Sequence, residues 1–199
     1  MSAIVVISFT VIYHLVTIFM IRKLKLSTRK ICICAIIVAM TIVLDSIRFP
    51  LPTGATISLC SPIPLMLMAL LVDYRLAFMG GWLCGILALI LIPVWSLAHW
   101  GQFFVEHMIC FSCLGYTGLF GINKKYKVLL GVLLASAISI FAHTGSGVLF
   151  FSQNAWDGWN ALNYSLAYNL SQNVPLFIIC GIVVLSLPLN KIKSIIERK

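Results

Sequence analysis

Four polar side chains in the second half of the chain combine a carboxylate, an imidazole, a phenol and a carboxamide. They are Glu106, His143, Tyr164 and Asn169, and each lies within or near the start of a long apolar stretch. A carboxylate can accept a hydrogen bond from an exocyclic amine and offset a positive charge, while aromatic faces stack on rings and attract cations. The set therefore suits a small polar heterocycle, including a cationic one.

The composition indicates that lipid surrounds most of this chain. Of its 199 residues, 61% are hydrophobic and 10% are charged, against about 45–50% and about 25% in soluble domains. The apolar stretches are long and continuous, whereas a transmembrane β-barrel shows short alternating segments. We therefore predict an all-α, polytopic membrane helical bundle. In such a bundle an ionisable group such as Glu106, or its neighbour His107, normally faces a cavity or a partner and marks function.

Seven apolar stretches, separated by short polar or Pro- and Gly-containing connections, predict seven membrane-spanning helices in one bundle. They cover approximately residues 3–21, 31–49, 57–73, 76–93, 103–121, 128–150 and 163–188. The first lacks the basic start and the small-residue cleavage site of a secretory signal. We therefore expect it to be a retained helix.

Basic residues predict the orientation, because cytoplasmic loops of membrane proteins are enriched in lysine and arginine. With seven spans and the N-terminus outside, all 14 Lys and Arg residues except Arg48 fall on the cytoplasmic side. The C-terminus is then cytoplasmic, and the protein is a multi-pass component of the cell membrane. This distribution accounts for the net charge of +9, so we expect no nucleic-acid partner.

The predicted topology places Glu106, His143, Tyr164 and Asn169 at one depth in the outer half of the membrane. Tyr164 and Asn169 are five residues apart and point about 140° away from each other on an ideal helix. Both reach one pocket only if the helix start is irregular or the ligand lies between them. His143 is explained equally well as a structural residue bonded to a neighbouring helix.

Other polar and aromatic residues have structural explanations. Asp45 and Arg48, near the outer end of the second stretch, can neutralise one another. The Cys110-x-x-Cys113 pair lies within an apolar stretch, where packing explains it better than a redox or metal site. We expect no metal and no cofactor. Four tryptophans near the outer boundary are typical of an interfacial aromatic belt: Trp95, Trp100, Trp156 and Trp159.

Residues 143–169 closely resemble the thiamine-specific S component, the substrate-binding subunit, of energy-coupling factor (ECF) transporters. The matching elements are His143, Gly147, Ser152-Gln153, Ala155-Trp156, Gly158-Trp159, Ala161, Tyr164 to Ala167 and Asn169, together with Gln102, Glu106, Gly115, Gly118 and Phe120 upstream. The resemblance covers about residues 29–190. It implies a six-helix substrate-binding domain over residues 29–199, preceded by an additional N-terminal transmembrane helix and a basic loop over residues 1–28.

The resemblance also implies roles in binding thiamine. Glu106 would hold the aminopyrimidine, His143 would lie against the thiazolium ring, and Tyr164 and Asn169 match further ligand-binding positions. Phe151 stands where the family carries a stacking tryptophan, and His107 stands where it carries a tyrosine. The family carries a second stacking tryptophan at a position that corresponds to about Ala55 here, and this sequence has no tryptophan near that position. A thiamine precursor or a related pyrimidine is therefore an alternative ligand.

The family further implies docking onto a membrane-embedded coupling subunit that works with two cytoplasmic ATPases. Ala35 and Ala39 have the small-xxx-small spacing that lets helices approach closely. Ordinary packing inside the bundle explains this spacing equally well. The chain has no Gly-x-x-x-x-Gly-Lys-[Ser/Thr] loop and so is not the ATPase itself.

Functions of other classes compete with a binding subunit. A secondary transporter commonly shows internal repeats and broken helices near the midplane, but no internal repeat is evident and the polar residues lie toward one side. An intramembrane hydrolase would use Ser146 beside His143, without an evident third group or a strained elbow. A purely structural subunit leaves Glu106 unexplained. We therefore predict a non-enzymatic binding subunit, with another small heterocyclic vitamin as the nearest alternative ligand.

Overall fold

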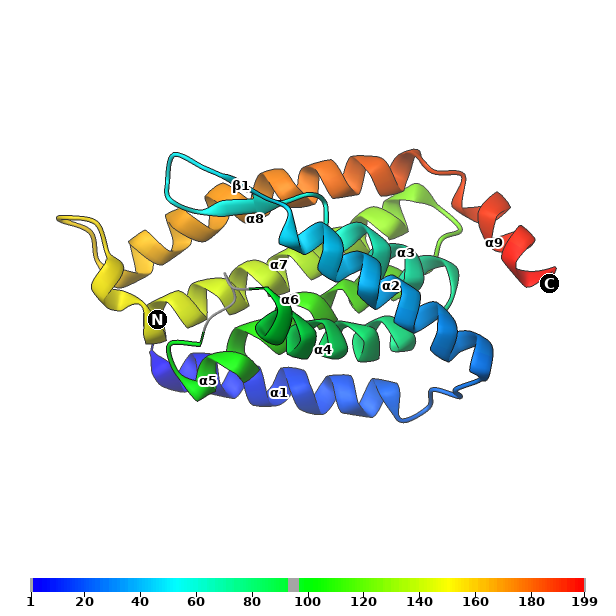
Figure 1. Cartoon of the computed structure of the whole chain (residues 1–199), viewed down its shortest axis with the longest axis horizontal. Helices are drawn as coiled ribbons and strands as arrows, with labels where there is room; N and C mark the ends of the chain where they lie inside the picture. The colour runs from blue at the N-terminus through cyan, green and yellow to red at the C-terminus, as the bar shows by residue number, and fades with distance from the viewer. Residues whose placement is uncertain (1, 93–96, 199) are drawn as a thin grey trace.

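A computed structural model describes residues 2–92 and 97–198 of the protein. In these ranges the chain forms a bundle of helices with one short β-hairpin (Figure 1). The two ends of the chain lie at opposite ends of the bundle (Figure 1).

Most of the bundle consists of long apolar helices. Within the described part of the chain, four are long and apolar enough to cross a membrane: α1 (Ala3–Ile21), α4 (Tyr74–Leu91), α7 (Lys125–Phe150) and α8 (Ala161–Ser186). The 19-residue α2 (Thr28–Ser46) is comparable in length but carries charged residues near both ends. With α3 (Pro62–Leu71) and a segment over residues 100–118, these helices confirm the predicted helical membrane bundle.

Two of the predicted stretches are shorter than expected because a hairpin interrupts them. α2 ends at Ser46, and β1 (Arg48–Pro50) pairs antiparallel with β2 (Thr56–Ser58). The prolines at 50 and 52 explain this break, because a residue before proline avoids the helical conformation. α3 then begins with a proline in its first turn and has only 10 residues, too few to cross the apolar layer alone.

The predicted helix over residues 103–121 consists of several short pieces. α5 (Trp100–Gln102) leads into a π-helical turn, η1 (Phe103–His107), which is followed by α6 (Met108–Ser112) and the 3₁₀ helix η2 (Cys113–Gly118). π-Helical turns are rare and occur frequently at functional sites. Here the turn carries Glu106.

Close packing against α4 determines where this segment lies. A Cβ atom on Gly81 would overlap the backbone of Ser112, and one on Gly85 would lie 2.6 Å from the carbonyl oxygen of His107. This Gly-xxx-Gly spacing lets the two backbones touch. Fully buried side chains of α3, α4 and α6, including Phe78, fill the adjoining core.

Two helices complete the chain at its ends. α1 packs against α4, α7 and η1 at one edge of the bundle (Figure 1). α8 ends at Ser186, two residues before Pro188, and a short amphipathic helix that was not predicted, α9 (Leu189–Glu197), follows and packs against α3.

Candidate ligand-binding site

The bundle has a partly open cavity of about 330 Å³, and every residue predicted to touch a ligand lines it. The predicted residues on its wall are Glu106, His107, His143, Phe151, Tyr164 and Asn169. Its walls come from α2, the hairpin, η1, α6, α7 and α8. Segments that are far apart in the sequence therefore meet at one site.

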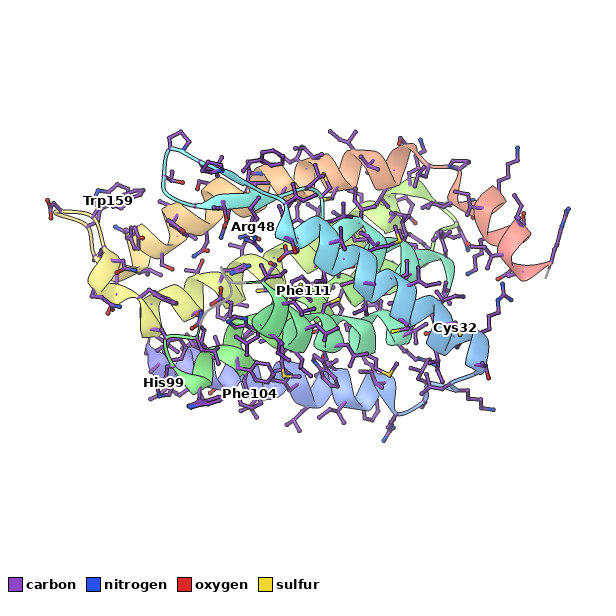
Figure 2. All side chains as sticks on the ribbon, in the orientation of Figure 1. Cys32, Arg48, His99, Phe104, Phe111 and Trp159 are labelled. Carbon is purple, nitrogen blue, oxygen red and sulfur yellow. The ribbon has the colours of Figure 1, made fainter. Side chains whose placement is uncertain are left out.

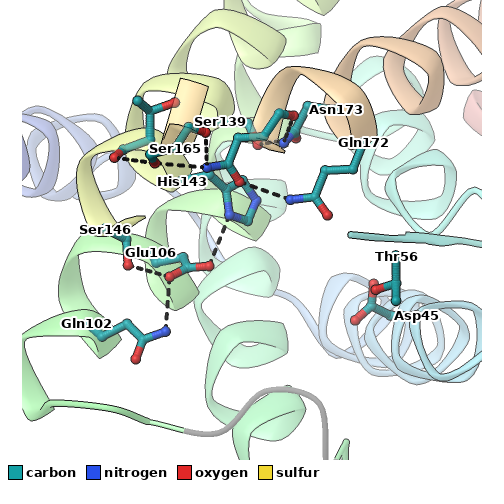
Figure 3. A network of polar contacts seen from close by, with 12 residues as sticks. Asp45, Thr56, Gln102, Glu106, Ser139, His143, Ser146, Ser165, Gln172 and Asn173 are labelled. Carbon is teal, nitrogen blue, oxygen red and sulfur yellow. Dashed lines mark hydrogen bonds and ion pairs between the residues drawn. The ribbon is translucent and has the colours of Figure 1, made fainter. Parts of the chain in front are cut away.

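Glu106 lies at the centre of a polar cluster on one wall (Figure 3). Its Oε1 is 3.0 Å from Nδ1 of His143, and its Oε2 accepts hydrogen bonds from Ser146 Oγ at 2.5 Å and Gln102 Nε2 at 3.1 Å. The Glu106 and His143 side chains keep 15% and 13% of their surface exposed. His143 is thus both bonded to a neighbouring element and part of the cavity wall, so the two explanations of this residue are compatible.

A second polar cluster continues the wall along α8. Asn169 Nδ2 donates to the Ser165 carbonyl at 2.8 Å, and Gln172 Nε2 donates to Asn169 Oδ1 at 3.0 Å. Ser139 of α7 donates to Asn173 Oδ1 at 3.2 Å. Sequence reasoning missed Ser139, Ser165, Gln172 and Asn173, although the four-residue spacing of 165, 169 and 173 marks one polar face of α8.

Tyr164 and Asn169 point in different directions on α8, but both line the cavity because the cavity is wide. α8 starts regularly at Ala161, with Asn160 Oδ1 accepting from the Asn163 amide at 2.8 Å. Its lining residues run from position 164 to position 177 and cover about half of the helix circumference. The helix start is therefore regular, and the cavity spans the faces of both side chains.

The opposite wall carries an ion pair. Arg48 Nη2 lies 2.5 Å from Asp45 Oδ2, which confirms the predicted pairing, and Arg48 Nη1 donates to Thr56 Oγ1 at 3.2 Å. Ser61 donates to Asp45 Oδ1 at 2.9 Å. These residues line the cavity as well, which the sequence did not indicate. Figure 3 shows Asp45 and Thr56 apart from the Glu106 cluster.

Aromatic side chains gather where α7 and α8 meet the connecting loop. Phe151 caps α7 and lines the cavity. Trp156 contacts Tyr164 edge-on, with ring centroids 5.1 Å apart. Trp100, Trp156 and Trp159 are exposed, as in an interfacial belt, while Trp95 lies outside the described residues.

The remaining predicted residues lie as follows. His107 lines the cavity although it is fully buried, and its carbonyl oxygen lies against Gly85 of α4. Ala55 is buried in the hairpin loop. Ala35 and Ala39 are exposed on the outer face of α2, so packing inside the bundle does not explain their spacing.

The bonds of Ser146 do not resemble those of a hydrolase. Ser146 donates to Glu106, which lies between it and His143. A hydrolase triad instead needs the imidazole beside the hydroxyl, with the carboxylate behind the imidazole. All seven cysteines are free, and Cys110 contributes to the cavity wall.

A helical membrane bundle whose cavity is lined by a carboxylate–imidazole pair and further polar side chains has the features of a membrane protein that binds a small polar molecule. Residues 31–196 match the sequence profile of the family described as thiamine transporter protein, and the chain belongs to this family. This confirms the family predicted from the sequence. Its members are transporters, which also confirms that the chain is not an enzyme. The first helix, α1, lies outside the matched residues.

Two relatives agree with this assignment. The chain is 28% identical over 167 residues to the thiamine transporter ThiT of Bacillus subtilis (strain 168), covering 75% of this chain and 84% of that protein. The fold is similar to a solved structure of ThiT from Listeria monocytogenes, with a TM-score of 0.70 and 23% identity, over 81% of this chain and 93% of that chain.

Proposed function

We propose that this protein is the thiamine-binding S component of an ECF-type importer. The observation that carries the proposal is the Glu106–His143 pair on the wall of a partly open cavity in a member of the thiamine transporter family. Thiamine is a small cation with an aminopyrimidine ring, which matches the chemistry of this pair.

Glu106 retains capacity for a ligand. An ionised carboxylate offers about four acceptor sites. Among the described residues, three side chains occupy three of these sites: Gln102, His143 and Ser146. The remaining site suits the exocyclic amine of the pyrimidine. The negative charge of the carboxylate, which stays 15% exposed on the cavity wall, also favours a cation.

The shape of the cavity supports the same class of ligand. Its volume of about 330 Å³ falls within the range of about 300–1,000 Å³ for small-molecule pockets. Phe151 and Tyr164 contribute aromatic side chains to its wall, and aromatic rings attract cations. The amides of Asn169, Gln172 and Asn173 add polar groups that orient a ligand.

The test is a titration of tryptophan fluorescence in the purified, detergent-solubilised protein. Trp156 contacts Tyr164 and gives a reporter at the edge of the cavity. We expect saturable quenching by thiamine and none by riboflavin. Quenching by the pyrimidine precursor but not by thiamine would identify the precursor as the ligand. No quenching by thiamine, the precursor or riboflavin would refute the proposal.

We further propose that α2 docks onto a membrane coupling subunit through Ala35 and Ala39. Both are exposed, and α1 packs on α4, α7 and η1 instead of on this face. Small residues let a partner helix approach closely. The N-terminus lies outside and the C-terminus in the cytoplasm, as the basic residues predict, so the coupling subunit and its two ATPases act from the cytoplasmic side.

The docking proposal predicts that substitutions on the exposed face of α2 abolish transport without affecting ligand binding. Ala35→Leu with Ala39→Leu should leave thiamine affinity unchanged and abolish uptake by cells that hold the coupling subunit and ATPases. Ala137→Leu is the matched control, because Ala137 is exposed on α7. Normal uptake by the double variant, or uptake by this chain alone in vesicles, would contradict the proposal.

A further inference from the structure

The additional helix α1 carries a histidine that bonds to the back of the binding-site wall. His14 Nε2 is 3.0 Å from the carbonyl oxygen of Phe104. A carbonyl only accepts, so the imidazole donates this hydrogen bond. Phe104 belongs to η1 and precedes Glu106 by two residues. Figure 2 shows Phe104 beside α1.

The conformation of η1 decides where Glu106 points. In this turn the Met108 amide donates to the Phe103 carbonyl, five residues back instead of four. Each residue of an α-helix turns the chain by about 100°. A return of η1 to α-helical bonding would therefore turn the side chains after it by about that angle relative to those before it, and Glu106, inside the turn, by part of that angle. Gln102 and Glu106 are four residues apart and would stay on one helix face, but Glu106 would turn relative to His143 and Ser146 of α7 and lose its contacts with them.

Two further contacts from α1 bracket the same region. The Tyr13 hydroxyl is 2.7 Å from Ser112 Oγ, at the end of α6, and Tyr13 is buried. The ring centroids of Phe9 and Phe141 are 4.3 Å apart. Phe141 lies on α7, two residues before His143. α1 thus contacts both elements that carry the Glu106–His143 pair.

We propose that α1 is a positioning element of the ligand-binding site, and that the His14–Phe104 hydrogen bond holds η1 in the register that directs Glu106 into the cavity. This inference rests on the proposed binding function. Among the residues that the structure describes, none of those that line the cavity belongs to α1. Its effect on binding passes through the backbone of η1.

The test is a double-mutant cycle read by thiamine affinity. His14→Leu should weaken binding about five- to tenfold, as for one lost hydrogen bond. His14→Gln, whose carboxamide still donates, should stay within about twofold of the unmodified protein. In a Glu106→Gln background, His14→Leu should have no further effect, because both changes act on one interaction. Leu15→Ala, at an exposed neighbour on α1, is the control.

Hydrogen exchange separates failure of this inference from failure of the binding function. Without any ligand, His14→Leu should speed amide exchange over residues 103–109, and His14→Gln should not. Unchanged exchange would overturn the inference even if thiamine binds. Additive effects of His14→Leu and Glu106→Gln would also overturn it, because α1 would then act independently of Glu106. Should His14→Leu not fold, Tyr13→Phe, which removes only the hydroxyl bonded to Ser112, takes its place with the same expectations.

Discussion

Glu106→Gln is the substitution that tests the binding site most directly. The carboxylate accepts from Ser146 and Gln102 and pairs with His143. A glutamine keeps one carbonyl acceptor but turns an amide donor toward some of these donors. It also removes the negative charge that faces a cationic ligand.

The expected loss is that of a charge-assisted hydrogen bond. Such bonds contribute about 1.5–3 kcal/mol, and neutral ones about 0.5–1.5 kcal/mol. Because glutamine retains one acceptor, we expect binding to weaken by about 1–3 kcal/mol. At about 1.4 kcal/mol for each tenfold change, this is about a 5- to 150-fold increase in the Kd of thiamine.

Fluorescence titration measures this change, with Glu197→Gln as the matched control. Glu197 is exposed at the end of α9, so the same chemical change there should leave the Kd unaltered. Size-exclusion elution and near-UV circular dichroism check that both variants remain folded. An unchanged Kd for a folded Glu106→Gln variant would refute a role of Glu106 in binding.

Three further substitutions test the cavity and the packing behind it. Phe151→Trp should tighten thiamine binding severalfold by adding ring surface at the cavity wall; looser binding by titration would mean that phenylalanine suits a differently shaped ligand. Arg48→Ala removes the guanidinium partner of buried Asp45 and should lower the free energy of unfolding by about 1–3 kcal/mol, and an unchanged Tm would contradict this. Gly81→Ala should lower the Tm, because overpacking costs about 1–3 kcal/mol where its Cβ meets the Ser112 backbone, whereas Gly181→Ala, whose Cβ meets only Val132 Cγ1 at 3.5 Å, should be tolerated.

Hydropathy identified the class of this protein and most of its helices. α1, α4, α7 and α8 begin and end within a few residues of the apolar stretches, because transfer into lipid depends on the local composition of each segment. The errors fall where proline or hydrogen-bond geometry overrides hydropathy, at the hairpin and at η1. Neither leaves a clear signal in an average over 20 residues.

The sequence by itself determined which polar residues needed an explanation, because an ionisable group in an apolar helix is costly wherever that helix packs. Only the tertiary structure decided what surrounds Glu106: Ser146 comes from α7, Gln102 ends α5 just before the π-helical turn, and Asp45 with Arg48 stand on the opposite wall. It also decided that α1 lies against η1 while Ala35 and Ala39 stay exposed. These arrangements depend on contacts between segments far apart in the chain, and local hydropathy carries no information about them.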